Sequence, residues 1–324
     1  MKDSYGREID YLRISVTDRC NLRCRYCMPE DIPSTPHQEI LRFEEILQIC
    51  RLAGELGIRK FKVTGGEPLV RKGCIDFLRE LKTLPCTEQV TLTTNGMLLS
   101  EYLPALKELG IDGINISLDT LNPKTFEQIT RHTGQEQVLE NILKCQELGI
   151  RTKVNSVLLE GVNDNEFFDL VHLAKDYAVD VRFIEIMPIG FGKDYHGYNK
   201  EKLLPRISAV YPDYQSVSDK RGNGPANYIK IPGFLGCIGF IDAVHGKFCN
   251  QCNRIRLTAD GILKLCLYYE NGLNLKELLR TGASPADIRC AMETAILGKP
   301  SEHRFHQSAL EGKPELRKMS QIGG

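Results

Sequence analysis

Three cysteines near the start of the chain have the spacing of a metal-cluster site. Cys20, Cys24 and Cys27 lie within eight residues, so one tight loop can turn all three sulfurs inward. A zinc site usually takes four ligands, often from two separated Cys-x-x-Cys pairs. Three thiolates from one loop suit a [4Fe–4S] cluster, because they fill three iron corners and leave the fourth open to bind a small molecule. We expect Tyr26 to lie beside that molecule; structural zinc and free thiols are the alternatives for this spacing.

A second group of three cysteines occurs near the other end of the chain. Cys249 and Cys252 form a Cys-x-x-Cys pair, and Cys266 follows after a predicted hairpin turn. Alone, this pattern favours structural zinc, with Cys237 or His245 as the fourth ligand. In a chain that already carries one open-cornered cluster site, a second [4Fe–4S] cluster becomes the favoured interpretation.

The strand predicted after the Cys-x-x-Cys pair carries two arginines on one face. Arg254 and Arg256 alternate with Ile255 and Leu257, so both guanidinium groups face the same side. Two arginines beside a cluster site indicate an anionic substrate rather than a packed core.

Further basic residues fall where the chain is expected to line a pocket. Arg13 and Lys62 occupy strand-like positions, and Arg71 and Lys153 are expected at the same rim. Placing a cation in a pocket costs desolvation free energy unless an anion binds there. Guanidinium and ammonium groups suit phosphate oxygens, so these residues predict a polyphosphate ligand.

The elements that must position these groups alternate between strands and helices over residues 12–187. Amphipathic patterns with apolar residues at i+3/i+4 intervals, such as Phe43–Leu56 and Val138–Leu148, separate short β-rich runs. Repeated βα units require parallel strands with right-handed crossovers. Six units predict an α/β fold, an incomplete (βα)6 barrel related to the TIM barrel. The predicted strands are Leu12–Val16, Lys60–Thr64, Val90–Thr94, Gly113–Leu118, Lys153–Leu158 and Val181–Ile186.

Polar and glycine-rich segments follow four of these strands. Chemistry in such barrels takes place at the carboxyl ends of the strands. Any one segment could merely cap a helix, but together with the cysteine loop they predict a lined pocket. The segments are Thr64-Gly65-Gly66-Glu67-Pro68, Thr93-Thr94-Asn95-Gly96, Ser117-Leu118-Asp119 and Met187-Pro188.

The alternation ends in a stretch rich in Gly, Pro and Tyr between Gly190 and Gly236. We place the domain boundary there, with residues 1–220 forming the barrel and residues 221–324 forming a module with the second cluster and substrate-binding groups. A helix is predicted over Pro285–Leu297, with Ser284 as its N-cap. The final residues, Gly323 and Gly324, have no side chains and could thread a narrow cleft.

Composition narrows the class of protein. Lys plus Arg and Asp plus Glu each number 42, so no net charge favours binding to nucleic acid or to an acidic membrane. No apolar run approaches the roughly 18 residues of a membrane span, so a cytoplasmic location is expected. In a reducing compartment, cysteines indicate metal binding rather than disulfides. Buried or free thiols are expected for the scattered cysteines, Cys50, Cys74, Cys86, Cys145, Cys237 and Cys290.

The first cysteine triplet and the Gly-Gly-Glu-Pro loop resemble those of radical S-adenosylmethionine (SAM) enzymes. With Leu12-Arg-Ile-Ser-Val-Thr-Asp-Arg-Cys20, the Cys249-x-x-Cys252-Asn-Arg-Ile-Arg segment, Cys266 and the terminal Gly-Gly, the chain resembles the GTP 3′,8-cyclase (MoaA) family over nearly its full length. The resemblance implies the first step of molybdenum cofactor biosynthesis, in which a 5′-deoxyadenosyl radical abstracts the 3′ hydrogen of GTP and C3′ then attacks C8.

The resemblance also implies cofactors, partners and residue roles. Two [4Fe–4S] clusters and SAM are expected, with Tyr26, Gly66, Ser117 and Met187 at SAM and the six clustered cysteines at the irons. The implied partners are cyclic pyranopterin monophosphate synthase and an electron donor such as flavodoxin or ferredoxin, and a homodimer is left open. The residues implied to hold GTP are Arg13, Lys62, Thr93, Lys153, Arg254, Ile255 and Arg256, and those implied in catalysis are Arg13, Arg254, Arg256, Gly323 and Gly324.

Two alternatives come from other classes of protein. A radical SAM peptide-modifying maturase would need more cysteines in the C-terminal module, where only Cys237 and Cys290 are spare. A non-catalytic iron–sulfur or zinc scaffold would need neither the Gly-Gly-Glu-Pro loop nor the polar strand ends. The sequence favours the cyclase over both.

Overall fold

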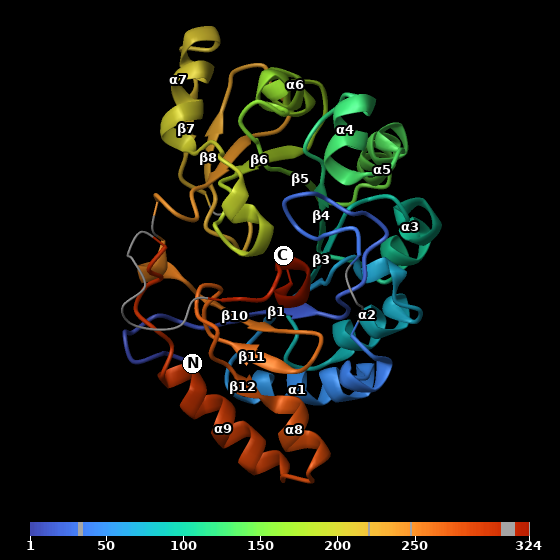
Figure 1. The fold of residues 1–324 in the computed structure, drawn as a ribbon, viewed down its shortest axis with the longest axis vertical. Helices are drawn as coiled ribbons and strands as arrows, with labels where there is room; N and C mark the ends of the chain where they lie inside the picture. The colour runs from blue at the N-terminus through green and yellow to red at the C-terminus, as the bar shows by residue number, and fades with distance from the viewer. Residues whose placement is uncertain (32–34, 220, 247, 306–314, 324) are drawn as a thin grey trace.

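A computed structural model describes residues 1–31, 35–219, 221–246, 248–305 and 315–323. One twelve-stranded sheet curves around the centre of the molecule (Figure 1). Its strand order is β12-β11-β10-β1-β2-β3-β4-β5-β6-β9-β8-β7.

The middle of the sheet is the predicted parallel barrel. All six expected strands exist, within one or two residues of the predicted bounds, and each pairs in parallel with its neighbour in sequence. These strands are β1 (Tyr11–Ser15), β2 (Lys60–Thr64), β3 (Gln89–Thr94), β4 (Gly113–Ser117), β5 (Thr152–Ser156) and β6 (Asp180–Ile184).

Along each strand, the alternation of apolar and polar residues determines which side chains face the interior of the barrel. On β2, Phe61 and Val63 are fully buried in the apolar layer, while Lys62 between them points to the barrel interior. Successive strand residues point to opposite faces. The outer face is therefore covered by helices, and the inner face is left free to carry polar side chains.

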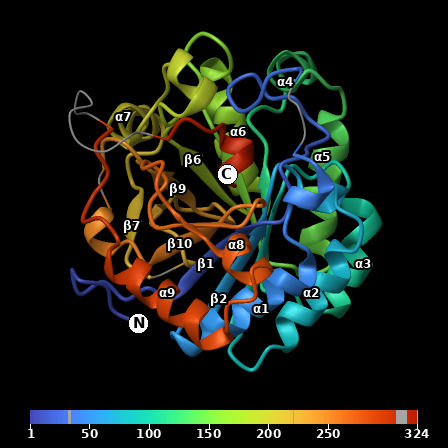
Figure 2. The same cartoon turned by 60° about the horizontal axis from the view of Figure 1, so that its bottom comes forward.

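Helices form a ring outside the sheet, as expected for right-handed βα units (Figures 1 and 2). Their apolar sides pack on the strands, and the predicted helical patterns at Phe43 and Val138 are confirmed as parts of α1 and α5. The helices are α1 (Phe43–Glu55), α2 (Cys74–Thr83), α3 (Leu99–Glu108), α4 (Pro123–Thr130), α5 (Gln135–Glu147), α6 (Phe167–Asp176) and α7 (Lys200–Val210).

Strands from the C-terminal third extend the same sheet on both sides. β10 (Arg254–Leu257) pairs in parallel with β1, and β9 (Ile238–Ile241) pairs in parallel with β6. In the described residues β9 and β10 do not pair with each other, so the barrel stays open. Antiparallel strands complete the two edges: β7 (Gln215–Val217), β8 (Asn227–Lys230), β11 (Ile262–Lys264) and β12 (Leu273–Asn274). The division at residue 220 stays a prediction, because the sheet is continuous across it.

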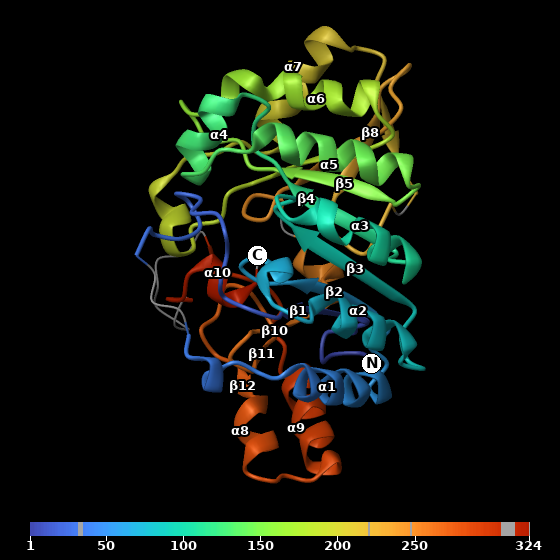
Figure 3. The same ribbon diagram turned by 90° about the vertical axis from the view of Figure 1, so that its right-hand side faces the viewer.

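The remaining helices lie at the C-terminal end of the chain. α8 (Leu275–Arg280) and α9 (Pro285–Leu297) pack beside α1 (Figure 3), and Ser284 caps α9 as predicted by accepting the amide of Asp287 at 3.2 Å. The short helix α10 (Met319–Ile322) brings the end of the chain back to the centre of the barrel (Figure 1).

Candidate active site

The inner face of the barrel encloses a cavity of about 410 Å³. Residues from every strand of the barrel line it, and both cysteine groups open onto it. Cavities of this size hold ligands as large as a nucleotide or a drug. Residues that are far apart in the sequence therefore line one cavity.

The first cysteine loop follows β1, as predicted, and lies at the carboxyl end of the strands. Cys20, Cys24 and Cys27 all line the cavity. Burial raises the pKa of Cys20 to about 11 and that of Cys27 to about 12, and it raises the pKa of Cys24 well above the usual value. The Leu22 amide donates to the Cys20 sulfur at 3.4 Å. Amide donors to sulfur are typical of protein cradles for iron–sulfur clusters.

The Gly-Gly-Glu-Pro loop packs directly on the segment that leads into these cysteines. A Cβ on Gly66 would lie 2.3 Å from the Arg19 carbonyl oxygen, and one on Gly65 would lie 2.6 Å from the Thr17 carbonyl oxygen. Only glycine fits such a close backbone approach. Gly66 also lines the cavity, so the position expected at SAM is one where packing requires glycine.

A buried carboxylate supports each side of the first cysteine loop. Tyr26 donates from its hydroxyl to Asp119 at 2.6 Å, and Asp119 also accepts the Val157 amide at 2.8 Å. Glu67 accepts the Asn95 amide at 2.6 Å and the Thr94 hydroxyl at 2.8 Å. Burial raises the pKa of Asp119 to about 6 and the pKa of Glu67 to about 7.

The second cysteine group opens onto the same cavity from the amino end of β10. Cys249, Cys252 and Cys266 all line it, and Cys266 follows the predicted hairpin, which turns at Gly261 with φ of 90°. Burial acts to raise the pKa of Cys252, but the positive charges of Lys299 and Arg254 outweigh it and lower that pKa to about 7.

The zinc alternative for this second group does not fit the structure. Cys237 lies at the amino end of β9, where its amide donates to Asp180 at 3.1 Å, and the His245 ring is engaged by the Glu185 carboxylate. Neither Cys237 nor His245 lines the cavity. In the described ranges, no three Cys, His, Asp or Glu residues are gathered closely enough to hold one metal ion. Cysteines on a four-iron cluster need no such closeness, because each binds a different iron.

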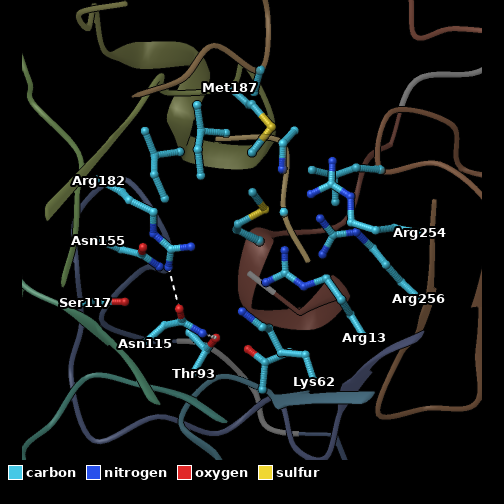
Figure 4. Close-up of a pocket in the computed structure, with 18 of the residues that line it drawn as sticks. Arg13, Lys62, Thr93, Asn115, Ser117, Asn155, Arg182, Met187, Arg254 and Arg256 are labelled. Carbon is cyan, nitrogen blue, oxygen red and sulfur yellow. Dashed lines mark hydrogen bonds between the residues drawn. The ribbon is translucent and has the colours of Figure 1, made fainter. Parts of the chain in front are cut away.

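Six basic residues on the strands line the cavity, and Figure 4 shows five of them, Arg13, Lys62, Arg182, Arg254 and Arg256, around one space. Arg13 on β1 lies opposite both Lys62 on β2 and Arg256 on β10 in the strand register. Desolvation lowers the pKa of Lys62 well below its usual value, and the charges of four neighbouring cations lower it further. The same causes lower the pKa of Arg13 to about 10. The six residues are Arg13, Lys62, Lys153, Arg182, Arg254 and Arg256.

The C-terminal segment reaches both halves of this site. The Gly323 carbonyl accepts from Arg256 at 2.6 Å, and the Ser320 amide donates to the Cys27 sulfur. Gly323 has φ of 77°, and a Cβ there would lie 3.0 Å from the Cβ of Ser15, so the position requires glycine. Lys264 and Glu315, both fully buried, form an ion pair that ties the segment to β11. Gly324 lies outside the described residues.

Most of the residues expected at the site line the cavity, including Thr93, Ser117 and Met187. Ile255 does not: its side chain is buried in the core, so a contact with substrate would use its backbone. The expectation that Arg71 lies at the rim is wrong. Arg71 donates to the carbonyls of Val16 and Leu41 and stacks on a phenylalanine ring outside the cavity. The Gly-Gly-Glu-Pro loop turns away from the barrel interior before this residue.

Several inward-facing residues were missed by the sequence analysis. Arg182 on β6 donates to the Asn115 side chain on β4 at 2.5 Å (Figure 4). The side-chain oxygens of Thr91 and Asn155 are buried and have no hydrogen-bond partner among the residues that the structure describes. The sequence did contain a signal for them. Thr91, Asn115 and Asn155 each lie two positions from a predicted site residue on the same strand, and so face the same side. Arg182 lies between two apolar residues, as an inward-facing polar residue of a strand does.

The chain matches two family models that divide it near residue 176. Residues 14–174 match the radical SAM superfamily, and residues 179–305 match the model described as Molybdenum Cofactor Synthesis C. Curated relatives extend this match to the whole chain. A GTP 3′,8-cyclase from Clostridium perfringens is 44% identical over 100% of both chains, and one from Peptoclostridium acidaminophilum is 46% identical over 99% of this chain and 98% of its own. The chain belongs to the GTP 3′,8-cyclase family. The resemblance read from the sequence is confirmed.

Solved structures with low identity share the fold. SuiB from Streptococcus suis, in its crystal structure bound to S-adenosylmethionine, gives a TM-score of 0.59 at 15% identity over 91% of this chain and 72% of its own. This likeness confirms the fold class, an α/β radical SAM barrel with a C-terminal module. No helix in the described ranges is long and apolar enough to cross a membrane.

Proposed function

We propose that this chain cyclises GTP to 3′,8-cyclo-7,8-dihydroguanosine triphosphate, the activity of its family. The observation that carries this proposal is the group of six cations enclosed in one cavity, between two sets of cysteines. Mutual repulsion and desolvation lower the pKa of Lys62, Arg13 and Arg256 together. Cations crowded in this way favour a ligand with several negative charges, and a triphosphate supplies them.

The cysteines fit the cofactors of the family. Cys20, Cys24 and Cys27 would hold one [4Fe–4S] cluster, with SAM between Tyr26, Gly66, Ser117 and Met187. Cys249, Cys252 and Cys266 would hold the second. When bound, the first cluster and SAM supply the 5′-deoxyadenosyl radical that takes the 3′ hydrogen of GTP.

The protein's own residues bind and orient the substrate in this proposal. Lys62, Lys153 and Thr93 would take the phosphates from the barrel wall, while Arg13, Arg254 and Arg256 would surround the nucleoside end near the second cysteine group. Arg256 also holds the Gly323 carbonyl at 2.6 Å, which would place the Gly323-Gly324 end against the substrate. A reactive radical attacks whatever lies closest, so precise positioning is the main contribution of these residues.

The pathway partners follow from the chemistry of the product. Cyclic pyranopterin monophosphate synthase would receive the cyclised triphosphate, and a low-potential donor such as flavodoxin or ferredoxin would reduce the first cluster. A cytoplasmic location and a homodimer stay predictions.

The test is an anaerobic turnover assay with both products measured. The chain is reconstituted with iron and sulfide, then mixed with dithionite, SAM and GTP, and mass spectrometry follows 5′-deoxyadenosine and an isomer of GTP. We expect both to rise together, with ATP in place of GTP as the control that gives no isomer. Deoxyadenosine that forms without any GTP isomer would contradict the proposed substrate, and no deoxyadenosine from a fully loaded protein would contradict the radical SAM activity.

A further inference from the structure

Two segments from opposite ends of the chain meet at the second cysteine group. One precedes β1 and contains Arg7, and the other, residues 299–303, directly follows α9 and is here named the 299–303 segment. Arg7 donates hydrogen bonds both to this segment and to the Cys249 carbonyl. The proposed function gives no role to either segment, although Lys299 and His303 line the cavity.

The Arg7 side chain binds four backbone carbonyls. Its Nη1 nitrogen donates to the carbonyls of Cys249 at 2.9 Å and of Ser301 at 2.8 Å. Its Nη2 nitrogen donates to the carbonyls of Pro300 at 2.7 Å and of Lys299 at 3.3 Å. Three of the four acceptors belong to consecutive residues, so one guanidinium group fixes the path of that stretch beside the second cysteine group.

Asp3 holds the Arg7 guanidinium in turn. The Asp3 carboxylate accepts from Nε of Arg7 at 2.6 Å and from the Arg7 amide at 2.9 Å. The Asp3 side chain is fully buried, and that of Arg7 is 5% exposed. With this bond, every N–H group of the guanidinium has an acceptor. Lysine has only three N–H donors and could not make the same set of bonds.

The 299–303 segment brings two groups to the second cysteine group. The Lys299 ammonium donates to the Leu265 carbonyl, next to Cys266, and its residue is only 3% exposed. The His303 amide donates to the Cys249 sulfur. Amide donors to cluster sulfurs and nearby charges are two of the means by which proteins set the potential of an iron–sulfur cluster.

The Lys299 ammonium interacts electrostatically with two cysteines of the second group. Burial lowers the pKa of Lys299, and the charges of Cys252 and Cys266 oppose that shift. A buried cation costs desolvation free energy unless a negative group lies beside it. A [4Fe–4S] cluster held by thiolates gains one negative charge when it is reduced. A cation beside it therefore stabilises the reduced form and raises the reduction potential of the cluster.

We propose that Lys299 raises the reduction potential of the second cluster, and that Arg7 is the positioning residue that fixes Lys299 beside it. The inference rests on the proposed function for the presence of this cluster, and it adds two residues that set the properties of the cluster without binding iron. The first cysteine loop is supported by the carboxylates of Asp119 and Glu67 instead, so the two clusters are expected to differ in potential.

The experiment is a potentiometric titration of the reconstituted full chain, followed by electron paramagnetic resonance. The signal that added SAM changes belongs to the first cluster, and the other signal belongs to the second. The wild type is compared with Lys299→Met, which removes the charge, and with Lys299→Arg, which keeps it. Lys230→Met is the matched control, because Lys230 also donates to backbone carbonyls, with that of Leu235 at 3.0 Å, but does not line the cavity.

The expected result is a shift in one cluster only. In Lys299→Met, the ratio of reduced to oxidised second cluster at a fixed potential should fall roughly tenfold, which is about 59 mV for a one-electron couple. The potential of the first cluster should stay at its wild-type value, which also shows that the fold is intact. Lys299→Arg should restore most of the shift, and Lys230→Met should leave both potentials unchanged.

A second pair of variants tests the role of Arg7. Arg7→Lys keeps the charge but loses carbonyl contacts, so it should speed hydrogen exchange of the 299–303 segment in the iron-free chain. In the reconstituted chain it should lower the potential of the second cluster, as Lys299→Met does. Arg280→Lys is the control, because Arg280 also binds a carboxylate, that of Glu45 at 2.9 Å, and the Ile40 carbonyl at 3.1 Å, and does not line the cavity.

The possible failures can be told apart. An unchanged potential of the second cluster in both Lys299→Met and Arg7→Lys would overturn the inference, and so would equal shifts of both clusters. A wild type that assembles only one cluster would contradict the cofactors of the proposed function and this inference with them. A wild type that assembles both clusters but cyclises no GTP would contradict the proposed function alone, because the shift in potential is measured without GTP.

Discussion

The two cysteine groups have similar sequence motifs but opposite electrostatic surroundings. Around the first, burial raises the pKa of the thiols, and the carboxylates of Asp119 and Glu67 raise it further. Around the second, Lys299 and Arg254 lower the pKa of Cys252 to about 7 against the effect of burial. Negative charge is therefore disfavoured on the first group of thiols and favoured on Cys252, although burial raises the pKa of its neighbour Cys249.

This difference explains why one chain can use two clusters for different tasks. A cluster near carboxylates is harder to reduce and, once reduced, is a stronger electron donor, which suits the cleavage of SAM. In the proposed function, a cluster beside cations would lie near the anionic substrate. The charges of the surrounding residues, rather than the cysteine spacing, distinguish the two sites.

The largest expected effect comes from removing one cysteine at each site. Cys24→Ala should abolish SAM cleavage, because the first cluster loses a ligand. Cys266→Ala should keep some uncoupled SAM cleavage and lose GTP conversion. Anaerobic assays of deoxyadenosine and cyclised GTP check both, with the exposed Cys290→Ala as control. Normal cyclisation by Cys266→Ala would remove the functional distinction between the sites.

Thiol reactivity of the metal-free chain measures the electrostatic difference directly. Cys252, with a pKa of about 7, is mostly thiolate at pH 8, whereas Cys20, with a pKa of about 11, is mostly thiol. Iodoacetamide should therefore alkylate Cys252 roughly tenfold faster, after allowing for the lower nucleophilicity of a less basic thiolate. The Cys252 rate should level off above pH 7 while the Cys20 rate keeps rising. Lys299→Met should shift the pH dependence of the Cys252 alkylation rate to higher pH. The same pH dependence for Cys252 and Cys20 in the wild type would contradict the electrostatic difference between the two sites.

Replacing a cavity cation should weaken binding and stabilise the fold. Lys62→Met should raise KM for GTP roughly tenfold, by loss of a charged contact. It should also raise the free energy of unfolding of the ligand-free chain by about 1–3 kcal/mol, because an enclosed cation among other cations is removed. Lys60→Met, two residues earlier on β2 and paired with Asp10 at 2.5 Å, is the control that should leave KM unchanged. Thermal unfolding and steady-state kinetics separate the two effects.

The smallest expected effect concerns the support of the first cysteine loop. Tyr26→Phe removes the hydrogen bond to Asp119 and leaves a buried carboxylate with one partner fewer. We expect a loss of about 1–2 kcal/mol in stability and a severalfold rise in KM for SAM. Tyr5→Phe, on a side chain that is 61% exposed, is the control. No change in either quantity would show that Asp119 does not position Tyr26.

The barrel and the position of the first cysteine loop could be predicted from the sequence because their signals are local. Period-two and period-3.6 patterns set the strands and helices, and the cysteine spacing fits one loop. Pairing between distant segments has no such signal. The joining of β10 to β1 and of β9 to β6 links residues more than 50 positions apart, and sequence patterns say nothing of such partners.

The errors and omissions at the site have the same origin. The sequence groups Arg71 with the basic residues expected at the rim, but Arg71 donates to the carbonyls of Val16 and Leu41 outside the cavity. Arg182 and Asn115 face inward on strands whose polar residues carry no motif, and their contact crosses from β6 to β4.

The pairing of β10 with β1, and of the last residues with the first cysteine loop, has a consequence for how the protein is made. Synthesis from the N-terminus completes the six βα units long before β10 exists to close their free edge. The loop expected to bind the first cluster is thus formed early, while Ser320, whose amide donates to the Cys27 sulfur, follows β10 by more than 60 residues. Metal delivery to the first site therefore has an open period during biosynthesis, before Ser320 reaches Cys27.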